Sequence, residues 1–167
     1  MLRVSGASGS LWAVKPNVEE DGKVFSLAGT SGANDSKDSQ TLLAFAAFTC
    51  SGRTIAVGCC SGSGTGTVPV YTLHLAENRF SRVGRSTAGC SALCTHPTDD
   101  QRLVVGTSAG TLHALQWGST HAQTDLLRIH KTAVRFVEYT RDAAYLVSAS
   151  EDMVVVWDAK VCKHCSH

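Results

Sequence analysis

Four side chains near the end of the sequence could bind a metal. Cys162, His164, Cys165 and His167 lie within six residues of one another. Thiolate and imidazole groups are the usual ligands of zinc, but a structural zinc site joins two separated pairs of ligands, so that the metal crosslinks the chain. The second, separated pair is missing here. The pattern therefore favours an outer strand with incidental Cys and His side chains, and a zinc site is the weaker alternative.

A glycine-rich run, Gly62-Ser63-Gly64-Thr65-Gly66, could cradle a phosphate group. Such a loop binds phosphate when a strand precedes it and a helix follows it, because the helix N-terminus meets the anion. The segment that follows, Val68–Leu73, is typical of a strand and is too short for a helix. We therefore expect a hairpin turn at this run and no bound cofactor.

Candidate catalytic groups are present but lack a catalytic context. The sequence holds seven histidines and many serines, yet no Gly-x-Ser-x-Gly elbow places a serine between a strand and a helix. The acidic clusters Glu19-Glu20-Asp21 and Asp99-Asp100 fall in expected turns, where solvated carboxylates are common. The sequence therefore predicts that the protein is not an enzyme.

Composition indicates a globular chain inside the cell. Apolar residues make up 43% of its 167 residues, charged residues make up 17%, and the net charge is +1. The longest apolar stretch, Thr41–Phe48, is far shorter than the ~20 residues of a membrane helix. The seven cysteines are an odd number and lie in strand-like segments, which favours reduced thiols over a disulfide framework. We expect a cytoplasmic or nuclear protein with no membrane contact.

Internal repetition organises the chain. Three similar segments, Ile55–Cys59, Leu103–Thr107 and Leu146–Ser150, begin 48 and 43 residues apart, and each combines apolar residues with small ones. A second strand-like segment follows each of them, and a further strand and a polar turn precede it. Four strands in a unit of about 43 to 48 residues match the period of a propeller blade.

The last unit resembles the WD-repeat family. Its segment Ser150–Asp158 ends in Trp-Asp, and His130 lies 27 residues before Trp157, where the family has its Gly-His. The resemblance implies a buried hydrogen-bonded network made by His130, Ser148, Asp152 and Trp157. The segment from Asp152 to Trp157 is one residue shorter than the family pattern, so Glu151 is an alternative for the acidic role.

The other units depart further from the family pattern. Tyr71 and Leu115 occupy the position of the tryptophan, and Val57 and Val105 occupy the position of the serine. These units should depend on apolar packing rather than on a polar network. We therefore expect one good repeat and two degenerate ones.

The expected fold is all-β, an incomplete β-propeller of about three and a half blades built from four-stranded antiparallel sheets. Residues 1–29 should form a partial blade from its second to its fourth strand. Residues 41–84 and 88–129 should form two blades, and residues 132–167 a blade with a truncated outer strand. A fragment of a larger propeller is the favoured explanation. The alternative is a chain that pairs with another copy through exposed blade faces.

The resemblance implies a scaffold that binds other proteins or peptides in a multi-subunit complex. The candidate partner-binding face draws on Arg85, Ser86, Lys131 and Glu151, together with the turn at residues 61–66. Two alternatives stay open: a subunit of a nucleic-acid-associated complex, and the non-catalytic propeller of a larger enzyme. The near-neutral charge makes nucleic acid the less favoured partner.

Overall fold

The computed structural model describes residues 2–5, 10–13, 23–26, 41–61, 67–118 and 124–159. All regular structure in these ranges is β-strand, and none of them holds a helix long and apolar enough to span a membrane. The strands are β1 (Leu2–Ser5), β2 (Ser10–Ala13), β3 (Lys23–Ser26), β4 (Thr41–Phe48), β5 (Thr54–Ser61), β6 (Val68–His74), β7 (Arg79–Ser86), β8 (Cys90–Thr95), β9 (Arg102–Thr107), β10 (Thr111–Gln116), β11 (Thr124–Arg128), β12 (Phe136–Tyr139), β13 (Tyr145–Ala149) and β14 (Val154–Asp158).

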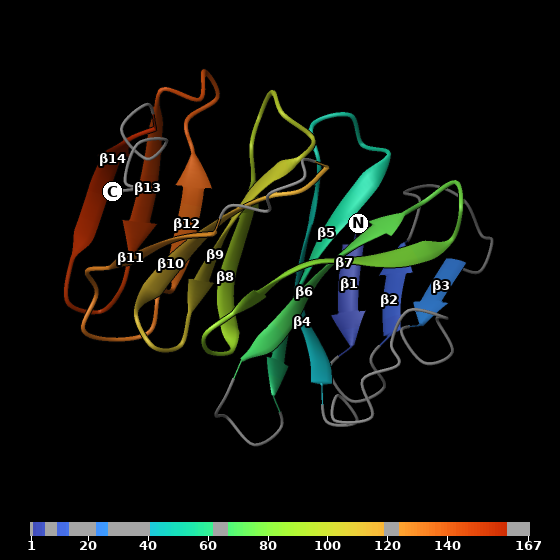
Figure 1. Ribbon diagram of the computed structural model, residues 1–167, viewed down its shortest axis with the longest axis horizontal. Helices are drawn as coiled ribbons and strands as arrows, with labels where there is room; N and C mark the ends of the chain where they lie inside the picture. The colour runs from blue at the N-terminus through green and yellow to red at the C-terminus, as the bar shows by residue number, and fades with distance from the viewer. Residues whose placement is uncertain are drawn as a thin grey trace.

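The described strands form four antiparallel sheets in chain order. Two have four strands, β4-β5-β6-β7 and β8-β9-β10-β11, and two have three, β1-β2-β3 and β12-β13-β14. Every strand pairs with its neighbour in sequence, and the sheets follow one another across the molecule (Figure 1). The expected fold class is confirmed: the chain is all-β, and its sheets are blades of an incomplete propeller.

The apolar runs form strands that are buried on both faces. All five residues from Ile55 to Cys59 in β5 are buried, and so are all five from Leu103 to Thr107 in β9. A strand with one solvated face would alternate apolar and polar residues, whereas a strand between two layers can be apolar throughout. The repeated segments of the sequence are therefore the second strands of successive sheets.

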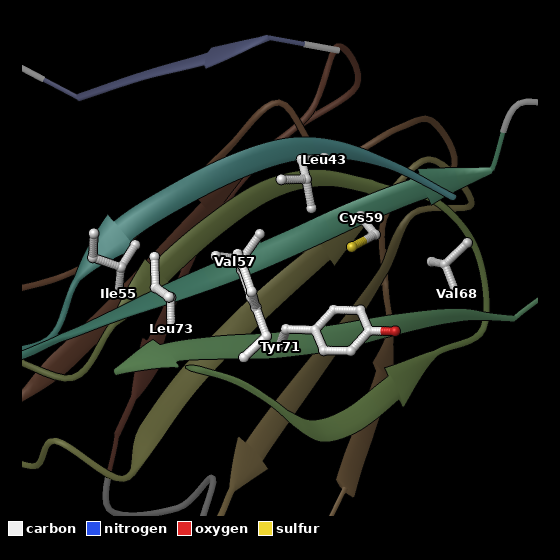
Figure 2. Packing of buried hydrophobic residues seen from close by; sticks show 8 residues of the cluster. Leu43, Ile55, Val57, Cys59, Val68, Tyr71 and Leu73 are labelled. Atoms are coloured by element: carbon white, nitrogen blue, oxygen red, sulfur yellow. The ribbon is translucent and has the colours of Figure 1, made fainter. Parts of the chain in front are cut away.

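Three apolar clusters hold the sheets together. The first lies on one face of sheet β4–β7 and includes Leu43, Ile55, Val57 and Leu73 (Figure 2). The second joins that sheet to sheet β8–β11, and the third joins sheet β8–β11 to sheet β12–β14. The core is thus a series of seams between sheets rather than one central cluster.

Two glycines allow close approach at the last seam. A Cβ atom on Gly106 would lie 2.6 Å from Val134 Cγ1, so only glycine fits beneath that side chain. Gly110 has a φ of +79°, a left-handed conformation that other residues adopt at a cost. A Cβ atom there would also overlap the carbonyl group of His130. Both glycines bring sheet β8–β11 against the segment that leads into β12.

Polar bonds cross the seams at both ends of the sheets. Ser91 Oγ donates to the carbonyl of Val134 at 2.7 Å, and Thr95 Oγ1 donates to the carbonyl of Phe48 at 2.7 Å. Asp100 Oδ1 accepts from the Cys50 thiol and from the backbone N–H of Ser51, at 3.0 and 2.8 Å. These hydrogen bonds hold the pKa of Asp100 below its usual value. Asp100 therefore joins two sheets and is more than a solvated turn residue.

The first strand of the last unit begins later than the sequence suggests. The apolar segment Ala133–Tyr139 predicts a strand throughout, but β12 begins at Phe136. The backbone N–H of Val134 instead donates to the carbonyl of Thr107 in the neighbouring sheet, at 3.1 Å. Residues before Phe136 therefore belong to the seam.

Candidate functional site

A chain of hydrogen bonds runs through the interior of sheet β12–β14. Trp157 Nε1 donates to Ser148 Oγ at 2.9 Å, and Ser148 Oγ lies 2.8 Å from His130 Nε2. Ser148 is fully buried and His130 is 3% exposed. The structure thus brings together three of the four residues that the resemblance proposes for a network, from a loop and two strands.

Ser150 connects this chain to the fourth residue, Asp152. Its hydroxyl lies 2.7 Å from His130 Nδ1 and donates to Asp152 Oδ1. The sequence reasoning missed Ser150, although it is the last residue of the repeated segment. Asp152 is joined to His130 through this hydroxyl, while Glu151 points to a different partner.

The donors and acceptors of the chain give both nitrogens of His130 a partner. The indole can only donate, so Ser148 accepts from Trp157. Ser150 donates to the carboxylate of Asp152, so it accepts from His130 Nδ1. His130 Nε2 lies beside Ser148 Oγ, and the imidazole is therefore bonded at both of its nitrogens.

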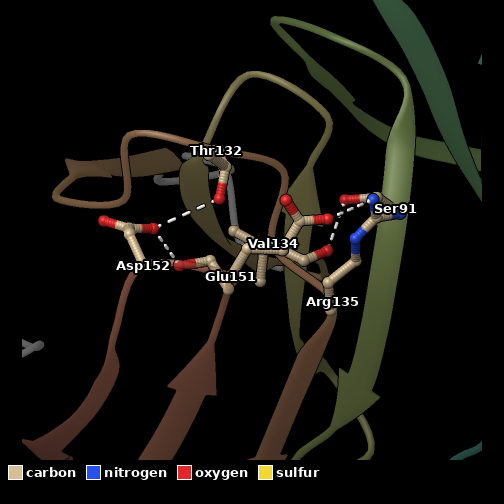
Figure 3. Close-up of polar contacts among 7 residues, drawn as sticks. Ser91, Thr132, Val134, Arg135, Glu151 and Asp152 are labelled. Carbon is tan, nitrogen blue, oxygen red and sulfur yellow. Dashed lines mark hydrogen bonds and ion pairs between the residues drawn. The ribbon is translucent and has the colours of Figure 1, made fainter.

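Asp152 ties the loop before β12 to the turn before β14. Its Oδ2 accepts from the backbone N–H of Lys131 at 3.3 Å, and its Oδ1 accepts from Thr132 Oγ1 at 3.2 Å (Figure 3). The Ser150 hydroxyl is the main cause that lowers the pKa of Asp152 to about 2, followed in the same direction by these loop contacts. The network therefore holds an exposed loop in one conformation.

Two of the proposed partner-binding residues lie at this end of the sheet. Lys131 and Glu151 are both exposed, in the loop and in the turn that Asp152 joins. Glu151 Oε1 pairs with Arg135 Nη2 at 2.8 Å, and both side chains are 64% exposed (Figure 3). Arg135 was missed, because the ion pair is apparent only when the two segments are folded together.

The other two residues lie elsewhere, and the expectation for one of them is wrong. Arg85 and Ser86 end strand β7, where Pro69 and Val68 pair with them, so neither is in a loop. Ser86 is only 1% exposed, and its hydroxyl donates to the carbonyl of Ala88 at 2.7 Å. Ser86 is therefore unavailable to a partner. Arg85 is exposed and lies 3.4 Å from Thr67 Oγ1.

A groove of about 610 Å³ follows the first strands of three sheets. Its lining includes Phe45 from β4, Leu93 and Thr95 from β8, and Phe136 and Glu138 from β12. Phe45 and Phe136 are 38% and 45% exposed, which is high for aromatic side chains. Each of these strands pairs on one side only within the described sheets. The groove therefore combines exposed rings with backbone edges.

A second buried histidine lies at the seam between sheets β4–β7 and β8–β11. His113 is 2% exposed, and its Nε2 lies 3.1 Å from Thr87 Oγ1 and 3.4 Å from the backbone nitrogen of Thr87. Thr111 Oγ1 lies 3.5 Å from the same nitrogen. Nδ1 has no hydrogen-bond partner in the described part of the chain, and burial lowers the pKa of this imidazole.

The described cysteines are free thiols, as the odd count suggests. Cys59, Cys90 and Cys94 are buried, Cys60 is partly buried and Cys50 is exposed. Burial raises the pKa of Cys90 and of Cys94 to about 12, so neither forms a reactive thiolate at neutral pH.

Two candidate sites from the sequence lie outside the described residues. They are the glycine-rich run at residues 62–66 and the tail at residues 162–167. The segment after the run is strand β6, as expected, and not a helix. The described residues contain no group of three or more His, Cys, Asp or Glu side chains that could hold a metal.

Comparison with known proteins relates the chain to solved structures only. No family model and no curated protein matches it. The 513 matching chains of solved structures include a chain of the crystal structure of a mitotic checkpoint complex. That chain is similar to this one with a TM-score of 0.66 and 19% identity, over 95% of this chain and 45% of the other. This chain therefore spans less than half the length of that neighbour and shares its fold.

Proposed function

We propose that this chain is a WD-repeat propeller segment that binds other proteins or peptides within a multi-subunit assembly and has no catalysis of its own. The linked residues His130, Ser148, Asp152 and Trp157 support the family assignment. The similarity in fold to a subunit of a mitotic checkpoint complex supports a role in an assembly. The free cysteines are consistent with an intracellular protein.

The groove along β4, β8 and β12 is the observation that carries this proposal. Two exposed phenylalanines, Phe45 and Phe136, line it beside strand edges that lack a partner in the described sheets. An extended peptide can use such edges for main-chain hydrogen bonds and bury apolar side chains against the rings. Glu138 and Arg141 in the lining add polar contacts that fix the orientation of a peptide.

The loop before β12 lies at the end of this groove and is held in place by hydrogen bonds. Asp152 and the chain behind it hold Lys131 and Thr132, and Arg135 belongs both to the groove and to the ion pair with Glu151. A surface that is already ordered loses little conformational entropy when a partner binds. This combination suits a platform for recognition better than a site of chemistry.

Selection of peptides from a random library tests the proposal, with Phe45→Ser as the variant. The best wild-type peptide should bind the Phe45→Ser protein at least ~10-fold more weakly, because the ring contributes buried apolar area. Phe48→Ser is the matched control, since Phe48 lies in the same strand, is 49% exposed and is outside the groove lining. Equal loss in both variants, or peptides that ignore Phe45, would contradict a groove-binding platform.

A further inference from the structure

Strand β5 carries two adjacent cysteines that face different neighbours. Cys59 lies in the first apolar cluster, on one face of sheet β4–β7 (Figure 2). Ala56 lies in the second cluster, which joins this sheet to sheet β8–β11. Because successive residues of a strand point to opposite faces, Gly58 and Cys60 share the face of Ala56. Cys60 is therefore directed at sheet β8–β11, and Cys59 is directed away from it.

Cys90, the first residue of β8, faces the same seam from the other sheet. It is buried and belongs to the second cluster. A Cβ atom on Gly58 would lie 2.4 Å from Cys90 Sγ, so this sulfur occupies the space that the glycine leaves open. A Cβ atom on Gly89 would lie 3.5 Å from Cys60 Cβ. The Cβ atoms of a disulfide are about 3.5–4.5 Å apart. The two strands therefore approach to disulfide distance one residue before Cys90.

The other described cysteines lie in different surroundings. Cys59 is in the first cluster, and Cys94 is in the third cluster, which faces sheet β12–β14. Cys50 is exposed, and its thiol donates to Asp100 Oδ1. Among the cysteines that the structure describes, Cys60 and Cys90 are therefore the two that share one seam.

We propose that Cys60 and Cys90 are a redox-sensitive pair, which forms a disulfide across the seam when the protein meets a low-molecular-weight disulfide such as glutathione disulfide. The two thiols differ in access. Cys60 is partly exposed, whereas Cys90 is buried and its thiol donates to the carbonyl of Ala92 at 3.3 Å. Cys60 therefore reacts first and Cys90 second. The bond joins β5 to β8 and crosslinks two sheets, and the proposal does not depend on the groove.

The reaction consists of two exchange steps. The Cys60 thiolate attacks one sulfur of glutathione disulfide, so that a bond forms between Cys60 and glutathione and one glutathione thiolate leaves. The Cys90 sulfur then attacks the Cys60 sulfur, and the second glutathione leaves. The protons of both cysteines pass to the two glutathione thiolates, and the two electrons that the cysteines lose reduce the glutathione disulfide. Because burial raises the pKa of Cys90 to about 12, the second step is the slower one and should accelerate as the pH rises.

Peptide mapping of the full 167-residue chain tests the proposal. The protein is equilibrated with glutathione disulfide in mildly alkaline buffer, free thiols are alkylated, and the unfolded chain is digested with trypsin for mass spectrometry. Cleavage after arginine places Cys60 in the peptide of residues 54–79 and Cys90 in that of residues 86–102. These two peptides should be recovered as one disulfide-linked species, which dithiothreitol separates.

Variants assign the bond to its two sulfurs. Cys90→Ala should stop the reaction after the first step, with glutathione retained on residues 54–79. Cys60→Ala should leave residues 86–102 unmodified, because Cys90 is buried. Cys59→Ala and Cys94→Ala are the matched controls, since these cysteines lie in the same two peptides but in other clusters, and both variants should still form the linked species.

A thermal melt gives a second readout, because a disulfide between the two sheets restricts the unfolded chain. Oxidation should raise the Tm of the wild type by roughly 5–10 °C and should not raise that of Cys60→Ala or Cys90→Ala. A wild type that yields no linked peptides at equilibrium, or that stops with glutathione on Cys60, would overturn the proposal. A linked species that persists in Cys60→Ala or in Cys90→Ala would also overturn it, because other sulfurs would then carry the bond.

Discussion

Trp157 Nε1 donates its hydrogen bond to Ser148 Oγ, 2.9 Å away, and the same hydroxyl lies 2.8 Å from His130 Nε2. One buried hydroxyl thus serves both an indole N–H, which can only donate, and an imidazole nitrogen. Strand β14, strand β13 and the loop before β12 meet at this atom. The stability of the last sheet and the position of its exposed loop are therefore coupled.

Removal of the Ser148 hydroxyl should lower the free energy of unfolding more than the loss of one small polar group would suggest, because two buried groups depend on it. Ser148→Ala leaves the indole N–H and His130 Nε2 without partners in the interior, at a cost of about 1–3 kcal/mol in the free energy of unfolding. Urea unfolding measures this change. Trp157→Phe removes the indole N–H, which is one of the two groups that would lose a partner. Ser148→Ala should therefore lower the free energy of unfolding by less in that background. Strict additivity of the two substitutions would show that the bond does not couple them.

A methyl group on Gly106 should push two sheets apart. Its Cβ would lie 2.6 Å from Val134 Cγ1, and overpacking of this kind costs about 1–3 kcal/mol. Val134→Ala in the Gly106→Ala background should recover part of the loss in a thermal melt, since it removes the opposing methyl groups. Gly89→Ala is the control, because its Cβ would meet nothing nearer than 3.5 Å. A similar loss in both single variants would refute the argument from close approach.

The carboxyl of Asp152 should titrate in a way that depends on Ser150. Its pKa is lowered to about 2, with the Ser150 hydroxyl as the largest cause and the Thr132 hydroxyl as the smallest. Ser150→Ala should raise the pKa towards the ordinary value more than Thr132→Val does, as NMR titration of the side-chain carboxyl would measure. Because the pKa is lower in the folded state, the contribution of Asp152 to stability is present above about pH 4 and is lost as the pH falls towards 2.

His113 should make the fold sensitive to mild acid. Burial lowers the pKa of its imidazole below the ordinary value for histidine, so the unfolded chain binds a proton more readily than the native chain does. The free energy of unfolding should therefore fall as the pH drops from about 7.5 to 5.5, through the unfolded pKa of histidine. His113→Gln should flatten this part of the stability curve. An unchanged slope in the variant would assign the acid sensitivity to other groups.

Much of the local structure could be read from the sequence because strand formation depends on local pattern. The repeated segments Ile55–Cys59 and Leu103–Thr107 lie in β5 and β9, and Leu146–Ser150 lies in β13 except for its last residue. The polar turns that precede these segments carry no regular structure. The motif Ser150–Asp158 also pointed correctly to residues that the fold brings into contact. The position of Phe136 at the start of β12 could not be read, because the residues before it bond to another sheet.

Only part of the candidate site could be predicted from the sequence. Ser150, Arg135 and His113 gave no signal of their own, since each acquires its role from a residue 16 to 26 positions away in sequence. Ser86 looked like a polar loop residue, yet the fold buries it at the end of β7. A polar residue in a strand can be exposed or enclosed, and its own neighbours in sequence do not decide which.

The sequence by itself determined which segments become strands, how they repeat and which residue types can form a buried network. Those properties follow from short runs of apolar residues and from turn chemistry, which act within a few residues. Only the tertiary structure decided which faces are covered. Val70 and Val154 are the same residue type at the same register position, and one is fully buried while the other is 68% exposed, because burial depends on the sheet that lies opposite.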